Sequence, residues 1–246
     1  MTKTSLFLTT FIMTMFATVA AHGQSNDVYI DQVGDALNLV VNQTGDSNNV
    51  GGIDTDFTLG GDNMDVNIDQ TGDNNSIDGQ IIKADGVIAN IEMVGNSNQF
   101  DVNMGETGDV TDSTVDVTVT GDTNVVALIT GIENSAIGAD IDISITGSEN
   151  QMTSIIDSDT AVLNTNLDGD LNTINTTQLG WSDNSITMTL SGSDNQIDIM
   201  QSNDMQSSVI ELDSTMSGGT IVTSQGSERV EIDGVDNKLK FGSINL

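Results

Sequence analysis

The sequence repeats a short unit that begins with alternating apolar residues and ends in a turn. Each copy has two or three apolar residues at every second position, then one residue, a Gly, two or three residues and an Asn. The copies follow one another at a pitch of about 11 residues, or twice that, with some slippage. Self-similarity at a fixed period is the signature of repeat architectures, in which neighbouring units stack on one another. The clearest copies are QVGDALN (32–38), QTGDSN (43–48), IDQTGDNN (68–75), IEMVGNSN (91–98), VTVTGDTN (117–124), SITGSEN (144–150), QLGWSDN (178–184) and TLSGSDN (189–195).

Each part of this unit predicts a local conformation. Apolar residues alternate with other residues at 64–68, 115–119, 141–145 and 186–190, and a period of two is typical of a strand with one buried face. Gly adopts positive φ without a Cβ clash and Asn tolerates the left-handed region, so Gly-x-x-Asn predicts a turn. The turn glycines expected from the pattern are 34, 45, 60, 72, 95, 108, 121, 131, 147, 169, 180, 192 and 234. No helical apolar stripe follows residue 23, so we expect an all-β chain.

Strands and turns at a constant pitch build either a series of antiparallel hairpins or a solenoid. We favour a β-solenoid of stacked strand-turn-strand-turn coils, with about 22 residues in each coil. Stacking in register at about 4.8 Å places like residues above like, so Gln and Asn side chains can bond along the stack as ladders. The chain has no Pro, which would remove a backbone donor from such a stack. We expect the solenoid over residues 24–200, and degenerate repeats with a C-terminal cap over 201–246.

Residues 1–23 have the layout of a secretory signal peptide. Lys3 is followed by the apolar run LFLTTFIMTMFATVA and by two small-residue cleavage patterns, which end at Ala21 and Gly23. The apolar run is about 15 residues long, which is short for a membrane span, and no later stretch is apolar enough to cross a membrane. We therefore expect an exported mature chain without a membrane span. A retained N-terminal anchor is the alternative.

The charge of the chain restricts its partners. There are 37 acidic and five basic residues, and because Lys3 is the only charged residue in 1–23, residues 24–246 carry a formal charge of −33. A surface this acidic repels nucleic acid and anionic lipid, and it attracts divalent or basic partners. Turns rich in Asp and Asn suit hard cations such as calcium. No complete calcium-binding motif is present, however, so no residue is identified as a metal ligand.

Catalysis is not expected, and neither is a cofactor. There is no Cys, and the only His, His22, lies beside the cleavage site, so acid–base chemistry would rest on carboxylates alone. Aromatic platforms for sugars are scarce, and Trp181, which replaces a turn residue in one repeat, is expected on the surface. Ice binding needs regular rows of Thr, but the Thr-x-Thr pairs do not recur at one place in the repeat.

The unit Gln-x-Gly-x-x-Asn, followed by a second Gln about five residues later, resembles the curlin repeat of bacterial curli fibres. The residues that carry the resemblance are Gln32, Gly34, Asn38, Gln43, Gly45, Asn48, Gln70, Gly72, Asn75, Gln178, Gly180 and Asn184. By analogy with the family, Gln32 lies over Gln43 and both face inward. Elsewhere the residue two before Gly is mostly apolar, as at Met93, Val119 and Ile145, so the Gln ladder is largely replaced.

The resemblance implies a secreted subunit that stacks as a β-solenoid into extracellular amyloid fibres, for adhesion at the cell surface and a biofilm matrix. It also implies self-association, a curli-type export pore and a nucleator subunit. A monomeric acidic β-solenoid that binds divalent cations such as calcium, or acts as an adhesin, is the alternative function. Aspartates stacked about 4.8 Å apart repel by roughly 0.9 kcal/mol in water, so we expect fibres to need high ionic strength or divalent cations.

The C-terminal tail carries two lysines in an otherwise acidic chain. Lys238 and Lys240 lie in the segment KLKFGSINL. This segment either caps the solenoid or docks against an acidic neighbouring subunit, and a chance pair of exposed lysines is the alternative.

Overall fold

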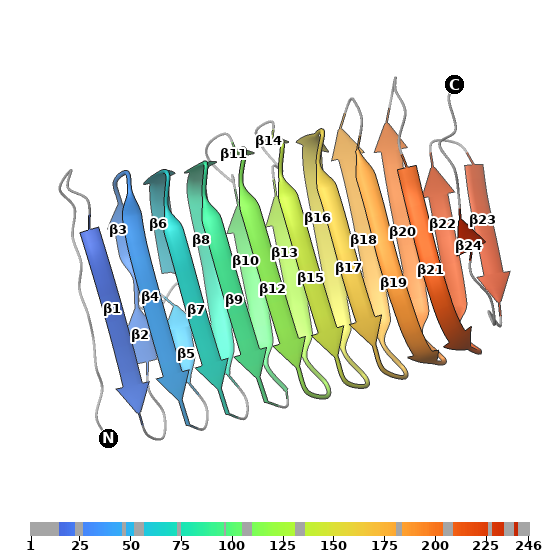
Figure 1. Ribbon diagram of the computed structural model, residues 1–246, viewed down its shortest axis with the longest axis horizontal. Helices are drawn as coiled ribbons and strands as arrows, with labels where there is room; N and C mark the ends of the chain where they lie inside the picture. Colours follow the sequence, from blue (N-terminus) through green and yellow to red (C-terminus); the bar gives the residue numbers. More distant parts are fainter. Residues whose placement is uncertain are drawn as a thin grey trace.

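A computed structural model describes residues 15–22, 27–45, 48–51, 57–72, 75–95, 97–104, 110–130, 136–180, 184–203, 209–225, 228–233 and 239–240. Every element in these ranges is a β-strand, and the strands lie side by side in two layers along the longest axis of the molecule (Figure 1). The all-β fold predicted from the sequence is confirmed.

The two layers are a 10-stranded sheet, sheet A, and a 14-stranded sheet, sheet B. Sheet A contains β1 (Met15–His22), β4 (Leu37–Thr44), β7 (Asp65–Thr71), β9 (Ile88–Val94), β12 (Thr114–Thr120), β15 (Asp140–Thr146), β17 (Val162–Asp168), β19 (Ser185–Ser193), β21 (Val209–Ser217) and β24 (Leu239–Lys240). Sheet B contains β2 (Asp27–Tyr29), β3 (Asp31–Val33), β5 (Asn49–Gly51), β6 (Phe57–Asp62), β8 (Ser76–Asp85), β10 (Gln99–Met104), β11 (Val110–Thr111), β13 (Val125–Thr130), β14 (Ala136–Ile137), β16 (Gln151–Asp159), β18 (Thr173–Gly180), β20 (Gln196–Asn203), β22 (Thr220–Gln225) and β23 (Glu228–Asp233).

The chain winds alternately through the two sheets, so each strand pairs with the strand one coil later in the sequence. In sheet A, β1 pairs with β4 and β15 pairs with β17. Both pairings are parallel, as in-register stacking of coils requires. Asp142 of β15 and its register partner Asn164 of β17 are 22 residues apart. The predicted β-solenoid is therefore confirmed.

The length of a coil varies more than its register does. The step between register partners rises to 27 residues from Asn38 to Asp65. It is 26 residues between successive corner residues Asn124 and Asn150. In the longer coils the sheet B strand is split, as β10 and β11 or β13 and β14, whereas β8 and β16 are continuous in shorter coils. The additional residues fall between the split strands and lie outside the described residues. From β1 to β21, the strands of sheet A stay paired in one parallel register.

The core lies between the sheets and is built by the alternation seen in the sequence. In β15, Ile141, Ile143 and Ile145 are at most 1% exposed, whereas Asp140 and Asp142 face solvent. Burying one such side chain contributes roughly 1.5–3 kcal/mol, and the contribution recurs in every coil. Large and small residues also complement each other across coils, because a Cβ at Gly79 would lie 2.2 Å from the ring of its register partner Phe57.

The two ends of the solenoid are built differently. At the N-terminal end, β1 covers β4 over eight residues; the prediction that residues 1–23 are removed on export stays a prediction. At the C-terminal end, the parallel register continues past residue 200 as far as Gln225. There β23 pairs antiparallel with β22, and β24 pairs antiparallel with β21 (Figure 1).

Candidate functional site

The repeated Gln-Gly-Asn unit forms one corner of the coil, where the chain leaves sheet A for sheet B. Gln43 is the last inward-facing residue of β4, Gly45 lies at the corner, and Asn48 is the first buried residue before β5. The Asn48 side chain donates from Nδ2 to the Gly45 carbonyl at 3.0 Å. The unit is therefore a closed turn, in which the polar Asn side chain satisfies the backbone of its own corner.

Asparagines at this corner form a buried ladder that runs through the solenoid. From Asn48 to Asn172, the backbone N–H of each Asn donates to the Oδ1 atom of the Asn one coil later, at 2.8 Å from Asn124 to Asn150 and again from Asn150 to Asn172. After Asn195 the ladder ends, because Gly219 holds the next position. All the rungs are at most 1% exposed. Each bond therefore replaces the hydrogen bonds to water that the backbone N–H and the side-chain oxygen lose on burial. The rungs are Asn48, Asn75, Asn98, Asn124, Asn150, Asn172 and Asn195.

A column of glycines lies beside the asparagines, and the close approach of the coils makes Gly necessary there. Gly147 has a φ of +133°, and a Cβ built on it would lie 2.1 Å from the Gly121 carbonyl oxygen of the neighbouring coil. A side chain at this position would therefore push adjacent coils apart, whatever its chemistry.

Two shorter glutamine ladders flank the core, one in each sheet. In sheet A, Gln70 Nε2 donates to Gln43 Oε1 at 2.7 Å and to the Ser76 carbonyl at 3.1 Å. In sheet B, Gln201 Nε2 donates to Gln178 Oε1 at 2.8 Å and to the Asn184 carbonyl at 3.1 Å. Each of these donors thus bonds along the stack and also across a corner.

The predicted site residues divide into those that build these ladders and those that do not. Gly72 and Asn75 repeat the geometry of Gly45 and Asn48, with Asn75 Nδ2 donating to the Gly72 carbonyl at 3.3 Å. Asn184 serves the opposite corner, where its Oδ1 accepts the Ala161 backbone N–H at 2.8 Å. Gly34 lies between β3 and β4 at that same kind of corner.

Three predicted positions differ from the expectation. Gln32 does not lie over Gln43, because Gln32 belongs to sheet B and pairs with Leu59, while Gln43 pairs with Gln70; the Gln32 side chain lies outside the described part of the chain. Asn38 lies within β4 on the outward face, with Nδ2 3.5 Å from Asp65 Oδ2. Gly180 ends strand β18 instead of forming a turn, and Trp181 lies outside the described residues.

The complete Gln-x-Gly-x-x-Asn unit does not select every residue of the ladders. Asn98, Asn124 and Asn150 follow Gly95, Gly121 and Gly147 by three residues without a preceding Gln. The spacing Gly-x-x-Asn alone, which defines the copies at 91–98, 117–124 and 144–150, selects all three. Gln201 carries no Gly two residues later, and only its register with Gln178 reveals it.

The ladders leave two buried acceptors without a partner. Asn48 Oδ1 is the first acceptor of the Asn ladder, and Gln70 Oε1 is the last of the sheet A Gln ladder. Met93 follows Gln70 in the register and carries no N–H group at its side chain. An unpaired buried acceptor costs free energy that a further rung would recover.

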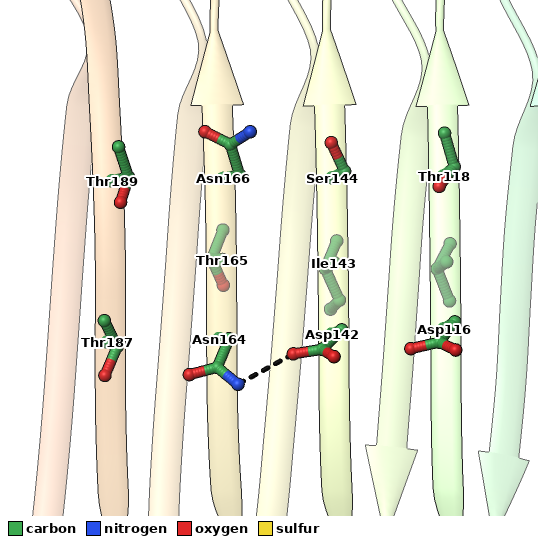
Figure 2. Close-up of a pocket in the computed structure, with 11 residues that line it drawn as sticks. Asp116, Thr118, Asp142, Ile143, Ser144, Asn164, Thr165, Asn166, Thr187 and Thr189 are labelled. Carbon is green, nitrogen blue, oxygen red and sulfur yellow. Dashed lines mark hydrogen bonds between the residues drawn. The ribbon is translucent and has the colours of Figure 1, made fainter.

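The outer face of sheet A carries a shallow groove of about 490 Å³ between two rows of polar side chains (Figure 2). One row is Asp116, Asp142, Asn164 and Thr187, and the other is Thr118, Ser144, Asn166 and Thr189. Asn164 Nδ2 donates to Asp142 Oδ1 at 2.7 Å. Ile143 and Thr165, which lie between the rows, are buried beneath the sheet.

Carboxylates in and beside this groove repel one another. Partial burial, followed by the neighbouring charges of Asp142 and Asp140, raises the pKa of the Asp116 carboxyl above its ordinary value. Partial burial and the charge of Asp142 likewise raise the pKa of Asp140. Among the described residues, no group of three or more His, Cys, Asp or Glu side chains is arranged to hold a metal ion. Within the same ranges, no helix is long and apolar enough to cross a membrane.

The chain matches no protein-family model, no curated protein and no solved structure. The β-solenoid with buried corner ladders is therefore established by the geometry of the chain itself.

Proposed function

We propose that the chain is an exported structural subunit that self-associates by stacking its coils end to end into cross-β fibres. The fibres would be extracellular and serve surface adhesion and a biofilm matrix, as the resemblance to curlin repeats implies. Export through a curli-type outer-membrane pore and nucleation by a partner subunit belong to the same proposal.

The observation that carries the proposal is the buried Asn ladder. Each rung bonds to an identical residue in the next coil, as Asn98 does to Asn124 and Asn124 to Asn150. An Asn–Asn bond of this kind can form whether the next coil belongs to the same chain or to a second copy. The same backbone and amide bonds that hold the coils together can therefore hold copies together, as in cross-β stacks.

Fibre growth by the purified chain of residues 24–246 tests this function. We expect thioflavin-type dye binding, and fibre diffraction with a meridional repeat of about 4.8 Å. A protein that remains monomeric by sedimentation at every salt concentration, with and without calcium, contradicts the proposal. Genes for a curli-type export pore beside the gene for this chain would support the export route.

A monomeric solenoid that binds divalent cations is the second candidate, and the carboxylates near the groove favour it. Asp116 and Asp142 are register partners on the outer face of sheet A, and oxygen ligands of this kind suit calcium. Calcium titration of the monomer, followed by calorimetry, separates the two functions. Saturable heat without a change in molar mass favours the monomer.

A further inference from the structure

One column of sheet B places glutamines at both ends of the solenoid and other residues between them. The column is defined by the register of successive strands: Gln32, Leu59, Ile81, Met104, Thr130, Ile156, Gln178, Gln201 and Gln225. At the C-terminal end, Gln178 and Gln201 already bond to each other, and Gln225 holds the next position. The position at the N-terminal end is again a Gln.

The two ends of sheet B therefore match each other as neighbours in a stack. If a second copy follows β22 in the same parallel register, its Gln32 falls next to Gln225 and extends the Gln178–Gln201 ladder. Within the described residues, β2 pairs only with β5 and β3 only with β6. No other described strand pairs with the outer edge of β2 and β3, so this is the edge at which such a neighbour would add.

Charge favours the same head-to-tail arrangement over a head-to-head one. Residues 24–62 contain seven Asp and no basic residue. Arg229, Lys238 and Lys240 are three of the four basic residues that follow residue 23, and all three lie in or beside the C-terminal strands. Residues 209–246 also hold six acidic residues, so their formal charge is 3 − 6 = −3, against −7 for residues 24–62. Head-to-tail contact therefore repels less than contact between two N-terminal ends.

The C-terminal edge that this contact needs is already occupied. Strand β23 pairs antiparallel with β22 over six residues, from Thr220–Asp233 to Gln225–Glu228. A backbone edge pairs with one strand at a time, so a parallel strand from another copy can bond to β22 only after β23 leaves. The antiparallel direction also breaks the parallel register in which the ladders form.

We propose that β23 is a stop that holds the place of the next copy, and that its release from β22 exposes the surface to which β2 and β3 of a second copy bind. This inference rests on the proposed self-association. It adds the direction in which copies stack and the step that regulates stacking. Growth is head to tail, and it proceeds only from chains in which β23 has detached.

A disulfide between β22 and β23 tests the stop in the full chain. Val222 and Glu231 are register partners, and an antiparallel pair has a Cα separation that suits a disulfide. Because the chain contains no Cys, Val222→Cys with Glu231→Cys gives one defined bond, which mass spectrometry confirms. The control pair is Val125→Cys with Gln151→Cys, which are exposed register partners in the middle of sheet B.

The oxidised Val222–Glu231 variant is expected to lose fibre growth and to recover it on reduction. The control variant should grow equally well in both states. If the oxidised stop variant grows as fast as the reduced form, the stop is overturned and self-association stands. If the wild type and both reduced variants stay monomeric at every salt concentration, the proposed function itself fails.

Discussion

Asn124 represents a typical rung of the corner ladder, and its removal measures what one rung contributes. Its Oδ1 accepts the Asn98 backbone N–H at 2.7 Å, and its Nδ2 donates to the Gly121 carbonyl at 2.8 Å. Asn124→Ala leaves the buried Asn98 N–H and the part-buried Gly121 carbonyl without this side-chain partner, so we expect a loss of about 2–4 kcal/mol in the free energy of unfolding. Urea unfolding monitored by circular dichroism measures this loss.

Asn166→Ala is the matched control for that measurement. Asn166 is exposed on the outer face of sheet A, and a surface substitution of this kind changes stability by no more than about 0.5 kcal/mol. If the two variants lose the same free energy of unfolding, the hydrogen bonds of the ladder contribute nothing measurable to stability.

Gly147 tests the close approach of the coils separately from the ladder. A Cβ at Gly147 would lie 2.1 Å from a backbone oxygen, which cannot move without shifting a whole coil. At Gly86, with a φ of +64°, the nearest atom to a built Cβ is the Asn63 side-chain oxygen at 3.2 Å. Gly86→Ala should therefore cost about 1–2 kcal/mol from the left-handed backbone alone, and Gly147→Ala should cost clearly more by thermal unfolding.

Acid should stabilise the outer face of sheet A. The pKa values of Asp116 and Asp140 are raised in the folded chain, so the folded state binds more protons than the unfolded state as pH falls toward about 4. At neutral pH both carboxylates are charged, and their partial burial and repulsion lower the free energy of unfolding. Acidification through the raised pKa values neutralises them and removes this destabilisation.

The double variant Asp116→Asn with Asp140→Asn isolates this effect from the other carboxylates. Relative to the variant, the wild type should gain stability between neutral pH and about pH 4 in urea unfolding. A constant difference between the two proteins across that range would contradict the assigned repulsion.

At the scale of the elements, alternation and turn chemistry determine much of the fold, and register determines the rest. The alternation at 141–145 predicts both the strand and its buried face, because period two leaves only one way to bury the isoleucines. The sequence pattern predicts a corner at Gly60, but Gly60 lies within β6 and the positive φ is at Gly61. Because Gly60 and Gly61 are adjacent, the sequence pattern cannot tell which of the two lies at the corner.

The Gln ladders show why pairing could not be deduced from the motif. Gln32 and Gln43 are one repeat apart, which places them in opposite sheets, while stacking partners are a full coil apart, as Gln43 and Gln70 are. The antiparallel pairing of β23 with β22 could not be predicted from the repeat either, because it occurs where the repeat pattern is degenerate.

Gln201→Leu measures the Gln ladder of sheet B. The substitution removes the donors to Gln178 Oε1 and to the Asn184 carbonyl, so we expect a loss of about 1–3 kcal/mol in the free energy of unfolding. Gln196→Leu, on the exposed face of the same strand, is the control and should stay near wild type. The comparison fails to support the ladder if Gln196→Leu is the more damaging change.

At the scale of the whole molecule, charge opposes the association that the ladders favour. Residues 24–246 carry a formal charge of −33, and screening shortens the reach of each charge to about 3 Å at 1 M salt. We expect the rate of fibre growth to rise steeply with salt and to fall to zero in dilute buffer with chelator. Turbidity and dye binding across a salt series measure this dependence, and growth independent of salt would refute it.

The variable coil length has a consequence for what the solenoid can carry. The longer coils place their extra residues between split strands of sheet B, and Thr114–Thr120 still pairs in register with the sheet A strands on either side. Extra sequence at that position therefore leaves the stacking direction unchanged. We therefore expect the solenoid to tolerate an inserted peptide there, such as an epitope, and to display it at intervals fixed by the spacing of the coils.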